Sequence, residues 1–255
     1  MPMFELTPLF VVILVAMGLV AGVINTVAGG GSNLTLPALM MMGLPADVAN
    51  ATNRVGVFLQ CLVGMRGFDK QGRLEKGDLK GIMIPTLIGG FAGAVAASIL
   101  PVSFLKPILL GTMVTVALVI LIRPSAIMPA ADELALRVAD SPKAWWGLWL
   151  AGFYGGFVQA GVGFVLIAAL AGVLRYDLVR ANALKMLCTA AFTLVALVVF
   201  IWQGLIAWVP GLILAVGTMA GAKIGVKLAL NVSQRTLKWF LFLMTLCASA
   251  AALYW

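Results

Sequence analysis

The chain has 255 residues, of which 63% are hydrophobic and only 10% are charged. Soluble domains usually carry about a quarter charged residues and less than half apolar ones, so this composition excludes a water-soluble fold. A helical membrane span needs roughly 20 apolar residues, which leaves no room beside the spans for a separate soluble domain. The sequence therefore predicts an all-α membrane protein that forms a single transmembrane domain over residues 1–255.

The formal net charge is +8, and the chain contains no histidine. Lys and Arg in a membrane protein first mark the orientation of its loops, so we expect no nucleic-acid partner. Without histidine, the usual metal ligand and the usual general base are missing, so we expect neither an enzyme nor a metal or cofactor. Cys61, Cys188 and Cys247 lie in separate apolar runs and are expected to be buried apolar residues.

Apolar runs follow one another along the chain, at 6–27, 34–44, 47–66, 79–100, 104–122, 144–160, 163–174, 178–202, 206–229 and 236–254. No basic segment precedes the first run, which therefore reads as a retained helix rather than a signal peptide. The runs 34–44 and 163–174 are too short to span a bilayer. Each short run follows a long one and a glycine-rich break: Gly29-Gly30-Gly31-Ser32-Asn33 in one case and Gln159-Ala160-Gly161-Val162-Gly163 in the other.

The order of these features indicates an internal duplication. A shift of 130 positions (161 − 31) aligns Gly31 with Gly161 and keeps the long run, the break and the short run in register. The sequence thus predicts two repeats of about five helical elements each, 1–123 and 143–255, joined by a polar linker at 124–142. Repeats in membrane proteins are either parallel or inverted, and the loop charges choose between these two arrangements.

The loop charges favour inverted repeats. The loop from Arg66 to Lys80 is strongly basic, whereas its counterpart around Gln203 carries no charge. Alternating the elements across the bilayer places thirteen basic residues on one side: Arg66, Lys70, Arg73, Lys76, Lys80, Arg123, Arg137, Lys143, Arg175, Arg180, Lys227, Arg235 and Lys238. Only Lys106 falls on the other side, so the basic side is expected to be cytoplasmic and both termini periplasmic.

The two breaks are the first candidate site. Irregular backbone at membrane depth is tolerated where it lines a cavity, and interrupted helices at matching places in two repeats point to a transport site. The N–H groups that start the next helix can hold an anion, and Ser32, Asn33 and Thr35 are candidates to cap that helix. Asp47 and Asp177 are expected to cap the helices that follow. The alternative is that the glycines only allow close helix packing.

Two cations within apolar runs are the second candidate. Arg54 and Lys185 occupy nearly equivalent positions in the two repeats, and an intramembrane charge costs at least about 2.5 kcal/mol. Helical spacing of three and four places polar residues beside them: Asn50 and Asn53 with Arg54, and Asn182 and Thr189 with Lys185. The two stripes are expected to face each other and form a pocket for a small oxyanion. The alternative is that both cations extend to an interface, as Lys223 is expected to do.

The segment from Gly18 to Ser32, GLVAGVINTVAGGGS, with Leu36-Pro37-Ala38-Leu39, Gly43-Leu44-Pro45 and Ala49-Asn50-Ala51-Thr52-Asn53, resembles the signature of the TauE/SafE sulfite exporter family. The resemblance implies a secondary transporter of the bacterial inner membrane that exports sulfite, sulfonates or related organosulfur anions. It also implies that Thr52 lies near the translocation path; Gln159, Gly161 and Gly163 form a less regular counterpart. The candidate substrate-binding residues are Arg54, Lys185, Asn50, Asn53, Asn182, Thr52, Gly29, Gly30, Gly31, Ser32, Asn33, Gln159 and Gly161.

The expected partners are a small anion and the lipid bilayer, and a homo-oligomer is compatible with the sequence. The GGGS break lacks the Lys-Ser/Thr end of a phosphate-binding loop, so transport is expected to be passive or ion-coupled. Uniport, a proton carried on the anion, and Lys185 as a titrating group remain open. The alternatives to an oxyanion exporter are an anion channel of the same fold, a carrier for small carboxylates, a membrane enzyme and a structural partner.

Overall fold

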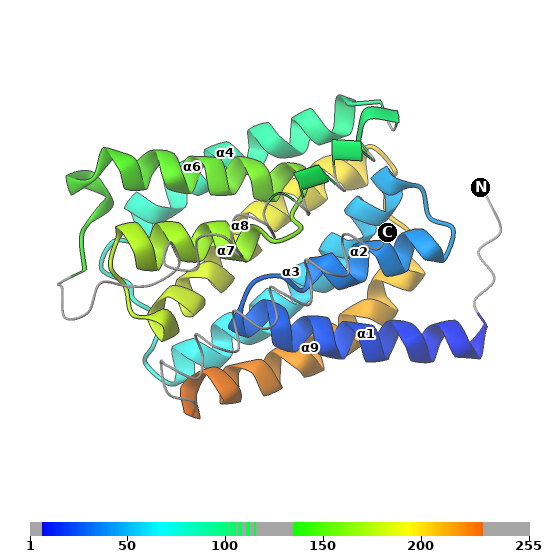
Figure 1. Cartoon of the computed structure of the whole chain (residues 1–255), viewed down its shortest axis with the longest axis horizontal. Coiled ribbons are helices and arrows are strands. Elements are labelled where there is room, and N and C mark those ends of the chain that lie inside the picture. Colours follow the sequence, from blue (N-terminus) through cyan, green and yellow to red (C-terminus); the bar gives the residue numbers. More distant parts are fainter. Residues whose placement is uncertain are drawn as a thin grey trace.

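The computed structural model describes residues 7–101, 103–105, 107–108, 111–112, 115 and 135–231, which form helices and connecting turns without strands (Figure 1). The predicted all-α class is confirmed for these residues. The elements are α1 (Pro8–Val27), α2 (Ser32–Met41), α3 (Ala46–Lys70), α4 (Leu79–Ile99), η2 (Val138–Asp140), α6 (Pro142–Phe157), α7 (Val162–Ile167), the π-helical η3 (Ala168–Val173), α8 (Leu178–Trp202) and α9 (Trp208–Asn231). The predicted run 236–254, Cys247, and most of the run 104–122 and of the linker lie outside the described residues.

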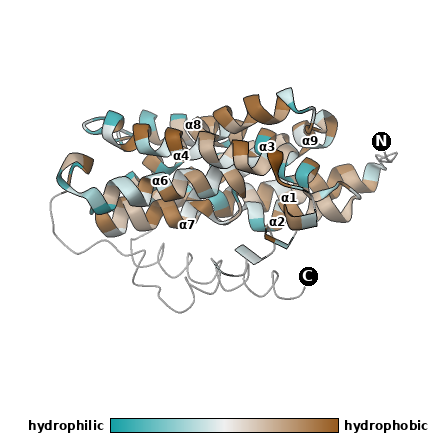
Figure 2. Ribbon diagram, turned by 90° about the horizontal axis from the view of Figure 1, so that it is seen from above, coloured by the Kyte–Doolittle hydropathy of each residue, from teal (hydrophilic) through white to brown (hydrophobic). Residues whose placement is uncertain are grey.

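Four of these helices, α1, α4, α8 and α9, are long and apolar enough to cross a membrane. Hydrophobic residues cover most of their length, and hydrophilic ones gather toward the helix ends and in a few interior stretches (Figure 2). Helix α3 is 25 residues long but polar in its first half, and α6 has 16 residues. Helix α2 has 10 residues, so at 1.5 Å per residue it is about 15 Å long, as the short apolar run predicts.

Side-chain caps explain several helix starts. Thr7 caps α1 and Ser141 caps α6, and proline follows each cap at the first helical position. An N–H at this position has no partner within the helix, so proline loses no hydrogen bond there. Asp177 caps α8 by accepting from two backbone N–H groups, which confirms the prediction. The prediction for Asp47 is wrong: α3 begins at Ala46, so Asp47 lies in its first turn and makes no capping bond.

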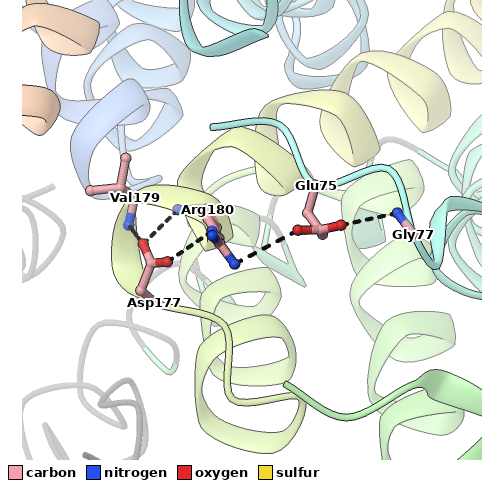
Figure 3. A network of polar contacts seen from close by, with 5 residues as sticks. All are labelled: Glu75, Gly77, Asp177, Val179 and Arg180. Carbon is pink, nitrogen blue, oxygen red and sulfur yellow. Dashed lines mark hydrogen bonds and ion pairs between the residues drawn. The ribbon is translucent and has the colours of Figure 1, made fainter. Parts of the chain in front are cut away.

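Basic residues collect at one end of the helices, named here the basic end. The Arg180 guanidinium lies 3.7 Å from the Glu75 carboxylate and also pairs with Asp177 at 3.3 Å (Figure 3). The backbone N–H of Val138 donates to Asp78, so the segments between α3 and α4, before α6 and before α8 meet here. The basic end carries Arg66, Lys70, Arg73, Lys76, Lys80, Arg137, Lys143, Arg175, Arg180 and Lys227. Arg123, Arg235, Lys238 and Lys106 lie outside the described residues.

Helices α1 and α6 start at opposite ends of the molecule (Figure 1). Helix α6 starts at the basic end, whereas α9 starts at the other end, where the N–H of Ala207 donates to Thr52. Helix α1 runs parallel to α9, because Val15 faces Gly217 and Thr26 faces Gly225. Exposed tryptophans flank both ends: Trp146 near the start of α6, and Trp202 and Trp208 around the turn between α8 and α9. Such aromatic belts are typical of the two membrane–water interfaces.

Glycines let two helix pairs approach to backbone contact. A Cβ on Gly22 or Gly221 would clash with the facing helix in the α1–α9 pair, and a Cβ on Gly93 or Gly156 would clash in the α4–α6 pair. Such spacing of small residues allows close packing in membranes, where the hydrophobic effect does not drive helices together. The alternative that glycines only allow close helix packing therefore holds for the glycines of these two helix pairs. The glycines of the two breaks make different contacts, described below.

Candidate functional site

Arg54 is fully buried on α3 and binds the carboxyl end of α6. Its guanidinium donates to the carbonyl oxygens of Gly155 at 2.8 Å and Gly156 at 2.6 Å, and more weakly to Phe157 at 3.4 Å. The amide of Asn50, one helical turn earlier, also donates to the Phe157 carbonyl, at 3.0 Å. The last carbonyls of a helix lack intrahelical partners and carry partial negative charge, so a cation and an amide stabilise this helix end.

Lys185 is the second buried cation, and it binds the carboxyl end of α1. Its ammonium donates to the carbonyl oxygens of Asn25 at 2.8 Å and Thr26 at 3.1 Å. The third acceptor is the side-chain oxygen of Asn182, one turn earlier on α8, at 2.6 Å. All three ammonium protons thus have acceptors. Neither cation extends to an interface, in contrast to Lys223, whose side chain is exposed.

The two cation sites are built alike. Asn25 and Thr26 precede Gly155 and Gly156 by 130 positions, the same shift that aligns the two glycine-rich breaks. Helices α1 and α6 end 130 positions apart, and α2 and α7 begin 130 positions apart. The sequence predicts a single pocket in which both cations face each other; the structure instead holds each cation in its own cluster. Each cluster joins a helix of one half to a helix end of the other.

The two breaks touch each other at the backbone. A Cβ on Gly29 would clash with Gly163, and a Cβ on Gly163 would clash with Gly29, while Gly30 faces the ring of Phe164. Gly29 has φ 101° and Gly161 has φ 73°, which glycine adopts without the penalty that other residues incur. Gly31, at the N-cap position of α2, packs against the backbone of Ala21. The breaks thus bring the interrupted backbones of the two halves together.

Asn53 fixes the first turn of α2. Its amide nitrogen donates to the Ser32 hydroxyl at 3.1 Å, and its oxygen accepts from the Thr35 hydroxyl at 2.6 Å. The prediction that Ser32, Asn33 and Thr35 cap α2 is therefore wrong, because Gly31 occupies the N-cap position without a side-chain bond and the hydroxyls turn to Asn53. This arrangement leaves the first N–H groups of the helix free of side-chain caps among the described residues.

The other candidates have separate roles. Thr52 accepts from the N–H of Ala207, before α9, and Gln159 donates to the Thr193 hydroxyl at 2.9 Å. Gln159 also has a positive φ of 64°, unusual for a residue with a Cβ. Asn33 is 4% exposed at the start of α2. Thr189, on the predicted stripe of α8, is buried as well.

Several buried side-chain atoms of the described residues have no hydrogen-bond partner, and three of them belong to Asn50, Arg54 and Asn182 of the two clusters. Within the described part of the chain they are Asn33 Oδ1, Asp47 Oδ1, Asn50 Oδ1, Arg54 Nε, Gln159 Oε1 and Asn182 Nδ2. All except the Asp47 oxygen belong to the residues that the sequence predicts to bind substrate. A buried polar group without a partner costs about 1–3 kcal/mol, so each of these atoms needs a partner that the described residues do not supply.

Sequence reasoning missed two interior polar residues. Gln60 donates to the Gly22 carbonyl at 3.3 Å, and Thr218 donates to the Gly56 carbonyl at 3.0 Å. Both are buried and tie α3 to its neighbours α1 and α9. Gln60 lies in the apolar run 47–66, and its polarity there was the available signal. No group of three metal-ligating side chains occurs in the parts of the chain that the structure describes.

Comparison with known proteins gives one family. The family profile described as sulfite exporter TauE/SafE matches residues 14–252. The chain is 27% identical over 252 residues to the probable membrane transporter protein YfcA of Escherichia coli strain K12, covering 99% of this chain and 93% of that protein. It is 26% identical over 250 residues to a probable membrane transporter protein of Haemophilus influenzae, covering 95% and 94% of the two chains. No solved structure matches the chain significantly.

Proposed function

Because the chain belongs to the sulfite exporter TauE/SafE family and is a membrane transporter, we propose that it exports a small sulfur-containing oxyanion. The substrate is sulfite, a sulfonate or a related organosulfur anion, carried by alternating access across the bacterial inner membrane. One observation carries the proposal: two buried cations, each on a helix end from the other half of the chain, lie among buried polar atoms without partners.

The proposed transport unit consists of two inverted repeats, 1–123 and 143–255, with the polar linker 124–142 between them. The recurrence of helix ends after 130 positions and the opposite directions of α1 and α6 support this arrangement (Figure 1). The basic end is the cytoplasmic side, since Lys and Arg concentrate in cytoplasmic loops. Both termini are then periplasmic, and α1 with α2 enters from the periplasm while α6 with α7 enters from the cytoplasm.

The proposed substrate ligands are the two clusters and the breaks between them. Arg54 Nε and the Asn182 amide are buried donors without partners, and both suit an oxyanion. Asn50 and Gln159 offer buried oxygens without partners, which suit an oxyanion that carries a proton on one oxygen. This donor and acceptor set favours a small, partly protonated oxyanion.

The energetics favour export without a dedicated pump. An inside-negative membrane potential drives anion exit by about 2.3 kcal/mol per charge for each 100 mV. Proton-coupled carriers usually rely on intramembrane carboxylates or histidines, and this chain has no histidine. Three routes fit this chain: uniport down the potential, a proton carried on the anion, and Lys185 as a titrating group.

A thermal-shift screen of the purified protein tests the substrate class. Sulfite at about 100 times its dissociation constant should stabilise the folded protein by about 2.7 kcal/mol and raise the melting temperature by a few degrees. Chloride at equal ionic strength is the control and should give no comparable shift. A shift with small carboxylates and none with sulfite or sulfonates would contradict the proposal and favour a carboxylate carrier.

A further inference from the structure

The described helices pack as two units that each combine both halves of the chain. The first unit contains α1, α2, α3 and α9, and the second contains α4, α6, α7, η3 and α8. Close glycine packing joins α1 to α9 in the first unit and α4 to α6 in the second. The units meet mainly along α3 and α8 and where the two breaks touch.

Only three interior side chains donate hydrogen bonds from one unit to the other, among the residues that the structure describes. Arg54 and Asn50 of the first unit bind the end of α6, and Lys185 of the second unit binds the end of α1. The other interior side-chain bonds stay within one unit, such as Asn53 with Ser32. The buried polar bridge between the units therefore depends on the two cations.

The two bridges lie in the interior of the molecule, each displaced toward a different end. Lys185 is seven residues into α8, which starts at the basic end, so it lies about 10 Å from the start of that helix. Arg54 is eight residues into α3, which starts at the other end, so it lies about 12 Å from that start. Each bridge is therefore closer to one side of the molecule than to the other.

The partners of both cations are uncharged carbonyl groups. A hydrogen bond in which both donor and acceptor are charged is stronger than one to a neutral carbonyl, so an oxyanion competes effectively for either cation. We propose that Arg54 and Lys185 are two latches, contacts that hold the two units together. This proposal rests on the proposed alternating access. Each access state opens one latch, and the substrate anion binds the cation that the helix end releases.

Cysteine modification in membrane vesicles without substrate tests the latches. Cys61 is a native reporter for the Lys185 latch: it is fully buried, and its neighbour Gly64 faces Met186 of α8. It is the single cysteine once Cys188→Ala and Cys247→Ala are made. The reporter for the Arg54 latch is Ala196→Cys. It is the single cysteine in a chain that carries Cys61→Ala together with Cys188→Ala and Cys247→Ala. Ala196 is fully buried and lies one helical turn before Phe200. The Arg54 guanidinium carbon lies 5.0 Å from the centre of the Phe200 ring.

Lys185→Gln should raise the rate at which a membrane-impermeant maleimide modifies Cys61 at least tenfold from the basic-end side, and leave the Ala196→Cys reporter unchanged. Arg54→Gln should raise the modification rate of the Ala196→Cys reporter at least tenfold from the opposite side and leave the rate of Cys61 unchanged. Each variant is therefore the matched control of the other. No change in either rate, or a response of both reporters to one variant, would overturn the proposal.

A milder pair of variants keeps the test valid if a glutamine variant does not fold. Asn182→Ala removes one acceptor from Lys185, and Asn50→Ala removes the donor beside Arg54, while both cations remain. Each should raise the rate at its own reporter about threefold, and equal rates to the parent chain would overturn the proposal. Because these measurements contain no substrate, they can fail while sulfite binding persists, and the two proposals fail separately.

Discussion

The double variant Arg54→Gln with Lys185→Gln should weaken sulfite binding at least about 100-fold. A hydrogen bond to a charged group contributes about 1.5–3 kcal/mol, so the loss of two such bonds between an oxyanion and the released cation accounts for this change at 1.4 kcal/mol per tenfold. Glutamine keeps an amide donor that can still reach the helix-end carbonyls, which limits the effect on folding. The measurement is the dissociation constant for sulfite, taken from the shift of the melting temperature with ligand concentration.

Lys223→Gln is the control for this variant. Lys223 is exposed on α9, so its replacement removes a positive charge without touching either cluster. Its sulfite affinity should stay within about twofold of the parent chain, because exposed charges are screened by salt. Unchanged affinity in the double variant would contradict the assignment of the two cations to substrate binding.

Gly163→Ala should abolish most transport while the protein remains folded. The added Cβ would clash with the backbone of Gly29, so the two breaks must move apart. Overpacking of this kind typically costs about 1–3 kcal/mol, and backbone has less room to adapt than a side chain. We expect the rate of sulfite efflux from proteoliposomes to fall at least about tenfold.

Gly147→Ala is the matched control for Gly163→Ala. Its Cβ would lie 3.6 Å from the Ala169 Cβ, which is ordinary van der Waals contact. The control should transport at the parental rate and melt at the parental temperature. Parental transport by Gly163→Ala would show that the contact between the breaks is not part of the transport path.

The membrane helices were largely predictable from the sequence, because each apolar run is bounded by glycine, proline or charge. The run 178–202 coincides with α8, and the run 79–100 matches α4 within one residue. Helix α7 starts at Val162, inside the second glycine-rich break and one residue before the predicted run 163–174. Hydropathy gives the length of each apolar segment, so it locates the helices. It does not identify which helices pack against one another.

The partners of the buried cations were not predictable from local pattern. Arg54 and its acceptor Gly155 are 101 positions apart, and Lys185 and Asn25 are 160 apart, so no periodicity connects them. The available signal was physical: a helix that ends within the membrane has carbonyls without partners, and a cation satisfies them. Asp47 shows the other limit, since the N-cap position is Pro45, two residues before the predicted cap.

Counterflow in proteoliposomes tests the central claim, that this chain is a carrier for a small sulfur oxyanion. Vesicles preloaded with unlabelled sulfite and diluted into radiolabelled sulfite should transiently accumulate label above its equilibrium level, because a carrier exchanges substrate across its two access states. Protein-free vesicles should accumulate none. Equilibration without an overshoot would indicate a channel, and an overshoot with small carboxylates but not with sulfite or sulfonates would contradict the substrate.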